Sequence, residues 1–335
     1  YTYNGASQGP NAATNTGSSL SYSFSYTGVA PTVYPASATR PTNAGNYTVT
    51  ATVAASSDGF WASANSDAAT FSIDRLQLTI TAPTVTKVYD GTVNAGTVTL
   101  GTVGNAVSGE TPGIAGSATA YSSKNVASNY SVTVSYTLSN NGAFLASNYS
   151  APSNNVISNA SITARAITIT AEAKSKVYGS SDPALTFQVT TGSLVPGDQF
   201  TGSLARSTGE NVGAYAINQG TVANANYSIT YESANLTITP RDLTITADDK
   251  SKTYGAANPT LTFTYSGLVN GNTAVSTLPT ISTTTTASSN VGTYPITLSG
   301  GSDPNYNITL VNGTFTVGKA NLTITAEDKS KTYGS

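Results

Sequence analysis

Cysteine, methionine and histidine are all absent from the 335-residue sequence. Without histidine or cysteine, the chain cannot form a Ser–His–Asp or Cys–His catalytic site. It also has no thiolate or imidazole ligand for zinc, haem, copper or an iron–sulfur cluster. No disulfide can stabilise the fold, so a packed core has to do so. Because methionine is missing even at the first position, we expect the chain to be an internal part of a longer protein.

Charge is also scarce. Charged residues make up 9% of the sequence, against about 25% in an average soluble domain. The net charge of −2 gives no basic field that would attract nucleic acid. No run of 18 apolar residues occurs, so we expect no membrane insertion of this segment. The composition therefore predicts no nucleic-acid partner.

Strand-forming residues are abundant. The chain contains 20 tyrosines and 8 phenylalanines, and these residue types, together with valine, isoleucine and threonine, favour strands. Short alternating runs such as LTITA, YSITY and TLTFTY lie between clusters of Gly, Asn, Pro and Ser. Helical spacing of apolar residues is missing. The sequence predicts an all-β protein.

Internal repeats are the strongest signal. LTITADDKSKTYG at residues 243–255 returns as LTITAEDKSKTYG at 322–334, as ITITAEAKSKVYG at 167–179 and, more weakly, as LTITAPTVTKVYDG at 78–91. Three copies end in a Tyr-Gly anchor and the weaker copy ends in Tyr-Asp-Gly; the anchor residues are Tyr89, Gly91, Tyr178, Gly179, Tyr254, Gly255, Tyr333 and Gly334. Two more anchors recur. These are NAGNY, NVGAY and NVGTY at residues 43–47, 211–215 and 290–294, and Asn-Tyr at 148–149, 226–227 and 305–306.

The repeats divide the chain into four domains and the start of a fifth. We predict repeats at residues 1–74 (lacking its first strand), 75–164, 165–240 and 241–318, with residues 319–335 forming the first strand and turn of a further repeat. Each complete repeat has room for six to eight strands, which is typical of a small β-sandwich. Because the connections are too short to act as flexible linkers, we expect the sandwiches to stack end to end as an elongated rod.

The motifs resemble two known families. KVYDG at residues 87–91 is similar to the YDG repeat, and ITA-x-x-KSK-x-YG followed by VG-x-Y and NY is similar to the MBG (mostly-β, Gly-rich) repeat. Both occur in tandem in large bacterial surface adhesins and haemagglutinin-like exoproteins. The resemblance implies Ig-like sandwiches and a stalk at the bacterial cell surface, outside the cell, and it brings no catalytic residues.

Strand periodicity predicts which residues face the core. Starting from Leu243, residues of one parity should be buried, namely Leu243, Ile245 and Ala247. Residues of the other parity should face water, namely Thr244, Thr246, Asp248, Lys250 and Lys252. The acid and the first lysine should form a weak surface ion pair. The lysines should also protect an edge strand from pairing with another chain.

The repeated tyrosines and the single tryptophan have alternative interpretations. The tyrosine of each Tyr-Gly anchor should pack at a sheet corner with its hydroxyl bonded to backbone, while the glycine supplies a positive φ; the alternative is an aromatic platform for sugars. Trp61 lies in the least regular repeat, where it is either buried or an exposed ligand contact.

Calcium at the joints between repeats is the one cofactor that the sequence leaves open. The candidate ligands are Asp242, Asp248, Asp249, Glu327 and Asp328. No complete calcium-loop motif occurs. The joints also carry basic residues, Arg75, Arg165, Arg241 and Lys319, which either pair with an acid of the adjoining repeat or are solvated.

A structural role is the leading functional hypothesis. We predict a non-catalytic spacer in a bacterial adhesin or filament, whose partners are the neighbouring repeats of the same longer chain. Two alternatives stay open: a repeat that binds a glycan or surface protein, with Trp61 as its contact, and self-association of identical chains into a bundle. An enzyme is the least favoured class, because a catalytic site is not expected to be copied into every repeat.

Overall fold

The computed structural model describes residues 1–17 and 21–333, and its regular structure consists of strands with one short 3₁₀ helix. The expected all-β fold is confirmed. The chain divides into two compact units: residues 1–165 with 225–228, and residues 166–224 with 229–335. Within the described part of the chain, no helix is long and apolar enough to span a membrane.

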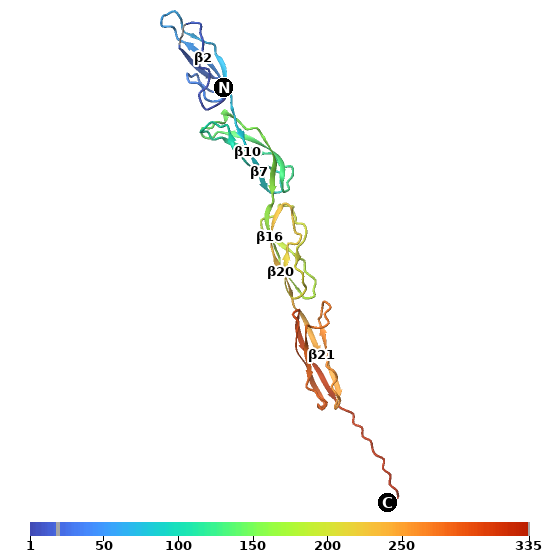
Figure 1. Ribbon diagram of the computed structural model, residues 1–335. Coiled ribbons are helices and arrows are strands. Elements are labelled where there is room, and N and C mark those ends of the chain that lie inside the picture. The colour runs from blue at the N-terminus through green and yellow to red at the C-terminus, as the bar shows by residue number, and fades with distance from the viewer. Residues whose placement is uncertain (18–20, 334–335) are drawn as a thin grey trace. The chain divides into compact units, whose positions relative to one another are not determined.

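The fourth repeat shows the arrangement most completely. Its strands are β21 (Arg241–Ala247), β22 (Lys250–Thr253), β23 (Phe263–Ser266), β24 (Thr277–Thr283), β25 (Gly292–Ser302), β26 (Tyr306–Val311) and β27 (Gly313–Gly318). They form a three-stranded sheet in the order β23-β21-β26 and a four-stranded sheet in the order β22-β27-β25-β24. Figure 1 labels β21 in this repeat. β21 runs parallel to β26, and β22 runs parallel to β27.

The third repeat has the same order of strands. They are β14 (Arg165–Ala171), β15 (Lys174–Val177), β16 (Phe187–Thr191), β17 (Ala205–Arg206), β18 (Gly213–Asn218), β19 (Tyr227–Glu232) and β20 (Ala234–Thr239). The two sheets are β16-β14-β19 and β15-β20-β18-β17. Two stretches of sequence that repeat each other thus fold into matching sheets.

The second repeat contains more and shorter strands. They are β5 (Leu76–Gln77), β6 (Thr79–Ile80), β7 (Thr84–Val88), β8 (Thr97–Thr99), β9 (Val103–Gly104), β10 (Gly113–Ala118), β11 (Ala127–Ser139), β12 (Tyr149–Ser150) and β13 (Asn155–Thr163), with a 3₁₀ helix at Ala146–Asn148. Its main sheet is β10-β11-β13-β7-β8, and β12 pairs with β5 and β6 with β9. The parallel pair β7–β13 corresponds to β22–β27 of the fourth repeat.

The first repeat contains a single four-stranded sheet. Its strands are β1 (Tyr22–Gly28), β2 (Gly45–Val53), β3 (Ala64–Asn65) and β4 (Ala69–Ile73). β2 pairs with each of the other three strands. The strands that would correspond to the β23-β21-β26 sheet do not occur among the described residues of this repeat.

The core lies between the two sheets of the fourth repeat. Leu243, Ile245 and Ala247 are buried, as the strand periodicity predicts. They belong to one cluster with Phe315 and Val317 of the facing sheet. A buried Leu or Ile side chain contributes about 1.5–3 kcal/mol, so burial of these residues favours the packing of the two sheets on each other.

The prediction that both lysines of KSK face water is wrong for the second one. Lys252 is 9% exposed and Lys176, at the same position of the third repeat, is 8% exposed. The parity of β21 does not continue into β22, because the chain leaves the first sheet at Asp248–Asp249 and joins the second sheet beside β27. The crossing resets which side chains point inward.

The first lysine forms the expected ion pair, although its side chain is only partly exposed. Lys174 lies 3.1 Å from Glu172, and Lys250 lies 3.9 Å from Asp248. These ion pairs lie at the surface, where such pairs contribute at most about 1 kcal/mol.

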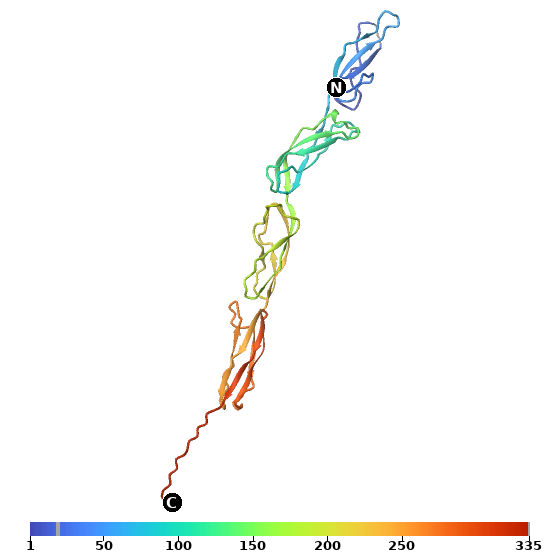
Figure 2. The ribbon, with the colours of Figure 1, turned by 180° about the vertical axis from the view of Figure 1, so that it is seen from behind.

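Residues 319–333 form no strand, although the sequence predicts one there. The ribbon beyond Gly318 contains no arrow in Figure 1 or in Figure 2. Leu322 and Ile324 are each 86% exposed, and Tyr333 is fully exposed. The matching strand β21 pairs with β23 and β26, which follow it in the sequence. Residues 319–333 have no such later strands in this sequence, and Gly334 lies outside the described residues.

Candidate functional site: the joints between repeats

The connections between repeats are short. β4 ends at Ile73 and β5 begins at Leu76, while single residues, Ala164 and Pro240, separate β13 from β14 and β20 from β21. Consecutive repeats are therefore joined by only one or two residues between strands. The recurring anchors of the sequence gather at these joints.

The Tyr-Gly anchors form turns at one end of each repeat. Gly91, Gly179 and Gly255 have φ angles of 77°, 80° and 82°, in the left-handed region that glycine adopts without strain. This part of the prediction is confirmed. The glycine of the turn also allows close packing between repeats. A Cβ on Gly5, in the Tyr3–Gly5 turn of the first repeat, would lie 2.8 Å from Val107 of the next repeat.

At three joints the tyrosine of the turn packs against the tyrosine of an Asn-Tyr pair. The rings of Tyr3 and Tyr149 lie 5.3 Å apart at 75°, and those of Tyr178 and Tyr306 lie 5.4 Å apart at 82°. Tyr89 and Tyr227, both in the first compact unit, form the same edge-on contact at 5.6 Å. Edge-on aromatic pairs contribute about 0.5–1.5 kcal/mol beyond the burial of area.

The hydroxyl of the turn tyrosine Tyr3 bonds to a side chain and not to backbone, which differs from the sequence-based expectation for the turn tyrosines. The Tyr149 hydroxyl bonds to the same side chain and also accepts from the backbone N–H of Val107 at 3.1 Å. Tyr3 donates to Glu110 at 2.6 Å, and Tyr149 donates to the other oxygen of the same carboxylate at 2.8 Å. At the joint of the third and fourth repeats, Asn272 takes the place of Glu110. Its amide lies 3.4 Å from the hydroxyl of Tyr178 and donates to that of Tyr306 at 3.1 Å.

Burial and the shared carboxylate keep the first joint's hydroxyls protonated. Burial raises the pKa of Tyr3 to about 12, and the Glu110 carboxylate that accepts its hydrogen bond adds to the effect. The pKa of Tyr149 is raised for the same reasons, burial first. Both hydroxyls therefore remain donors to Glu110 at neutral pH.

The asparagine of each Asn-Tyr pair makes two hydrogen bonds across the joint, which we call the asparagine clasp. The Asn148 side-chain oxygen accepts from the Ala44 backbone N–H at 2.9 Å, and its side-chain nitrogen donates to the Asn43 side-chain oxygen at 3.1 Å. The other clasps are Asn226 with Val126 (2.9 Å) and Asn125 (3.2 Å), and Asn305 with Val212 (2.8 Å) and Asn211 (3.3 Å).

Asn148 is fully buried. A buried amide left without partners would cost about 1–3 kcal/mol, so the clasp favours the one arrangement in which both of its groups are paired. The sequence contains a signal for this contact at two of the three joints, because Asn-x-Gly-x-Tyr at residues 43–47 and 211–215 is followed by Asn-Tyr at residues 148–149 and 305–306. Sequence reasoning identified both anchors but not that they bind each other.

Apolar contacts surround the clasp. Tyr3, Tyr47, Ile73, Leu78 and Tyr149 belong to one buried cluster that includes residues of the first and second repeats. A second cluster combines residues of the third repeat, such as Tyr178 and Ile238, with the core of the fourth. Within each compact unit the hydrophobic core is thus continuous through a joint.

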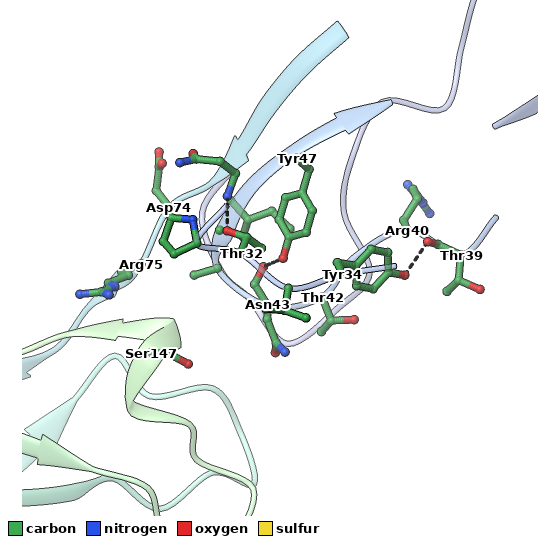
Figure 3. Close-up of a pocket in the computed structure, with 16 residues that line it drawn as sticks. Thr32, Tyr34, Thr39, Arg40, Thr42, Asn43, Tyr47, Asp74, Arg75 and Ser147 are labelled. Carbon is green, nitrogen blue, oxygen red and sulfur yellow. Dashed lines mark hydrogen bonds between the residues drawn. The ribbon is translucent and has the colours of Figure 1, made fainter. Parts of the chain in front are cut away.

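A polar pocket of about 690 Å³ lies beside the first joint. Figure 3 shows Tyr34, Asn43, Tyr47, Arg75 and Ser147 around it. Tyr47 donates to the carbonyl of Asn43 at 2.7 Å, a bond drawn in Figure 3, so the loop that carries the clasp also lines the pocket.

A charged cluster in the third repeat was not foreseen. Lys176 contacts Asp182 at 2.7 Å and Glu210 at 2.6 Å, and Arg206 binds the same two carboxylates. Hydrogen bonds to Arg206 and then Lys176 lower the pKa of Asp182 to about 2. In the fourth repeat the equivalent Lys252 donates instead to the carbonyls of Ala256 and Thr286.

The calcium candidates are not brought together. Asp242 accepts from Asn307 at 3.0 Å, Asp249 accepts from the Thr314 N–H at 2.6 Å, and Asp248 accepts from Thr262. Glu327 pairs with Lys329 at 2.8 Å. No group of three acidic residues suited to a metal ion occurs within residues 1–17 and 21–333, which include Asp328.

Trp61 is 49% exposed, and its neighbour Phe60 is 84% exposed. The Trp61 backbone is held by Ser56, whose side-chain oxygen accepts from the Trp61 N–H at 2.9 Å and whose own N–H donates to the Trp61 carbonyl at 2.9 Å. Among the joint cations, Arg241 donates to the carbonyl of Gly267 at 3.2 Å, within its own repeat.

Comparison with protein-family models matches most of the repeats. The model described as MBG domain (YGX type) matches residues 167–237 and 243–316, and the model described as YDG domain matches residues 74–156. The resemblance stated from the motifs is confirmed. No curated protein sequence matches the chain.

Proposed function

Because the chain belongs to the YDG and MBG domain families, we propose that it is a non-catalytic spacer segment of a large bacterial surface adhesin or filament. Such a segment would hold a binding tip away from the cell, outside the membrane. The families are compatible with this role, and the repeated joint is the observation that carries it.

The joint supports the spacer role because the same contacts recur from one joint to the next. The same asparagine clasp and the same tyrosine pair occur three times, each time between consecutive repeats. A catalytic or binding site normally appears once and carries a polar cluster of its own. Here the polar contacts that recur along the chain serve to connect one repeat to the next.

Small-angle scattering over a concentration series tests the proposal. A compact globule of this length should have a radius of gyration of about 20 Å, whereas four repeats following one another should give about twice that value. The larger value from a monomer supports the spacer. A compact monomer would contradict it, and a mass that grows with concentration would favour the bundle of identical chains.

Phe60 and Trp61 support a second candidate, a ligand-binding repeat. Two adjacent exposed aromatic side chains in one loop are typical of a contact for a glycan or another protein. Trp61→Ala and the matched control Tyr1→Ala, which also removes a half-exposed aromatic ring, should be compared on a glycan array. Binding that is lost only in Trp61→Ala would favour this second function.

A further inference from the structure

One end of the fourth repeat carries the same residues that form joints elsewhere. It consists of the Tyr254-Gly255 turn and the loop Asn290–Gly292, which we call the acceptor end. In the third repeat the equivalent Tyr178 is 5% exposed, because the fourth repeat covers it. Tyr254 and Val291 are each 50% exposed.

The loop of the acceptor end has the conformation that forms the clasp elsewhere. Tyr294 donates its hydroxyl hydrogen bond to the carbonyl of Asn290 at 2.9 Å. In the third repeat, Tyr215 makes the same bond to Asn211 at 2.8 Å, and there the next residue, Val212, donates to Asn305. A loop already held in its bound geometry loses little entropy when a partner binds.

The turn of the acceptor end is also open to a partner. A Cβ placed on Gly179 would overlap Val269 of the fourth repeat, whereas a Cβ placed on Gly255 would meet no atom within 4 Å. A Cβ placed on Gly5 of the first repeat would likewise overlap Val107 of the second repeat. Both valines begin a Val-x-Gly turn, closed by bonds from Glu110 to Val107 and from Asn272 to Val269. The surface around Gly255 thus matches one that receives such a turn.

We propose that the acceptor end is a docking surface for a further repeat of this family, and that its occupant is the repeat that opens at Lys319. That repeat would present an Asn-Tyr pair and a Val-x-Gly turn. Its asparagine accepts from the Val291 N–H and donates to the side chain of Asn290, and its tyrosine packs edge-on against Tyr254. Residues 322–334 support this occupant, because they differ from residues 243–255 only at Glu327, which replaces Asp248.

The two ends of a repeat are different surfaces, so this docking is head to tail. An Asn-Tyr pair fits the acceptor end of another repeat but not a second Asn-Tyr pair. Interfaces of this kind extend a series and do not close it. The inference deepens the proposed spacer role and rests on it for its biological meaning, but its test uses a different observable.

The test is to complete the fifth repeat in the full chain. Residues 256–318 are appended after Gly334, which restores a whole repeat by joining it to the nearly identical opening strand. Amide hydrogen exchange of Val291 and nitration of Tyr254 are then measured before and after the extension. We expect exchange to slow by about tenfold or more, which corresponds to about 1.4 kcal/mol, and nitration of Tyr254 to fall to the level of the buried Tyr178.

Two variants of the extended chain identify the contact. Substituting the appended copy of Asn305 by alanine should restore fast exchange at Val291. The matched control substitutes the appended copy of Asn290, at the far end of the same repeat, and should leave Val291 protected. Slow exchange of the amide of Ile324, which corresponds to Ile245 of the fourth repeat, shows that the new repeat has folded.

Unchanged exchange at Val291 and unchanged nitration of Tyr254 beside a folded fifth repeat would overturn the proposal. If the appended repeat does not fold, residues 180–240 take its place after Gly334 and present Asn226 and Tyr227; the same two outcomes then apply. A compact particle in the scattering experiment would count against the spacer role. It would leave the result at Val291 unaffected, so the two failures are distinguishable.

Discussion

The Asn305 side chain binds the backbone N–H of Val212 at 2.8 Å, although 93 residues separate the two in sequence. The contact joins the Asn-Tyr pair of one repeat to the Asn-Val-Gly loop of the repeat before it. Because the same contact recurs at three joints, predictions made for one joint can be compared with unaltered copies in the same chain.

Asn305→Ala should loosen the joint of the third and fourth repeats. The substitution removes the hydrogen bonds to Val212 and Asn211, and we expect a loss of about 1–2 kcal/mol. Exchange of the Val212 amide should accelerate by about 5–30-fold, while the core amide of Ile245 should be unaffected. Asn290→Ala is the matched control. Equal exchange at Val212 in both variants would contradict the role of the clasp.

The ring of Tyr178 should contribute more to the free energy of unfolding than its hydroxyl does. Tyr178→Phe keeps the contact with Tyr306 and gives up only the 3.4 Å contact with Asn272, so we expect a loss of less than about 1 kcal/mol. Tyr178→Ala removes a ring that is 5% exposed and should cost about 3–5 kcal/mol. Tyr254→Ala, at a position that is 50% exposed, should cost less. Urea unfolding of the three variants measures the loss in unfolding free energy for each and shows whether the losses follow this order.

Acid should destabilise the third repeat before the fourth. The pKa of Asp182 is lowered to about 2, first by Arg206 and then by Lys176. A carboxylate with a depressed pKa stabilises the folded state above its unfolded pKa, and this stability is lost as the pH falls toward the folded pKa. We therefore expect the loss between about pH 4 and pH 2.

The fourth repeat supplies the internal control for this prediction. Lys252 contacts carbonyl groups that do not titrate, so the strand β22 should not show the loss. Asp182→Asn should reduce, but not abolish, the acid dependence of the thermal unfolding of the third repeat, because the pKa values of Glu172 and Glu210 are lowered as well. A variant that keeps the wild-type acid profile would show that another group is responsible.

The first joint should weaken only at strongly alkaline pH. A tyrosine whose pKa is raised stabilises the fold below its unfolded pKa of about 10, and this stability is lost as the pH rises through the folded value. For Tyr3 that value is about 12, so the joint should weaken between about pH 10 and pH 12. Glu110→Gln should lower the pKa of Tyr3 only in part, because burial is the larger cause. Ultraviolet titration of the tyrosine phenolate measures the pKa of Tyr3 in the unaltered chain and in Glu110→Gln.

Chelation should leave the thermal unfolding of the chain unchanged. The acidic residues that the sequence offers for calcium each contact a neighbouring side chain or N–H, as Asp242 does with Asn307 and Asp249 with Thr314. A calorimetric scan with and without a chelator measures this. A clear fall in the unfolding temperature on chelation would mean that these carboxylates gather around an ion.

The repeat pattern predicted the strands and their buried faces, but it failed where a strand changes sheets. Leu243 and Ile245 are buried as their parity requires, since a side chain in a strand has only two directions to point. Lys252 is buried against its parity, because Asp248–Asp249 carry the chain from one sheet to the other. A period of two is reliable only along an unbroken strand.

The sequence by itself determined the all-β class, the repeats and the positive φ of the Tyr-Gly turns, because these depend on local periodicity and on the freedom of glycine. The tertiary structure alone decided that Asn148 binds Asn43 and that Tyr178 meets Tyr306. The partners of each pair lie more than a hundred residues apart in the sequence. Their hydrogen bonds and ring contacts form only when one folded repeat lies against the next, so no local pattern in the sequence specifies them.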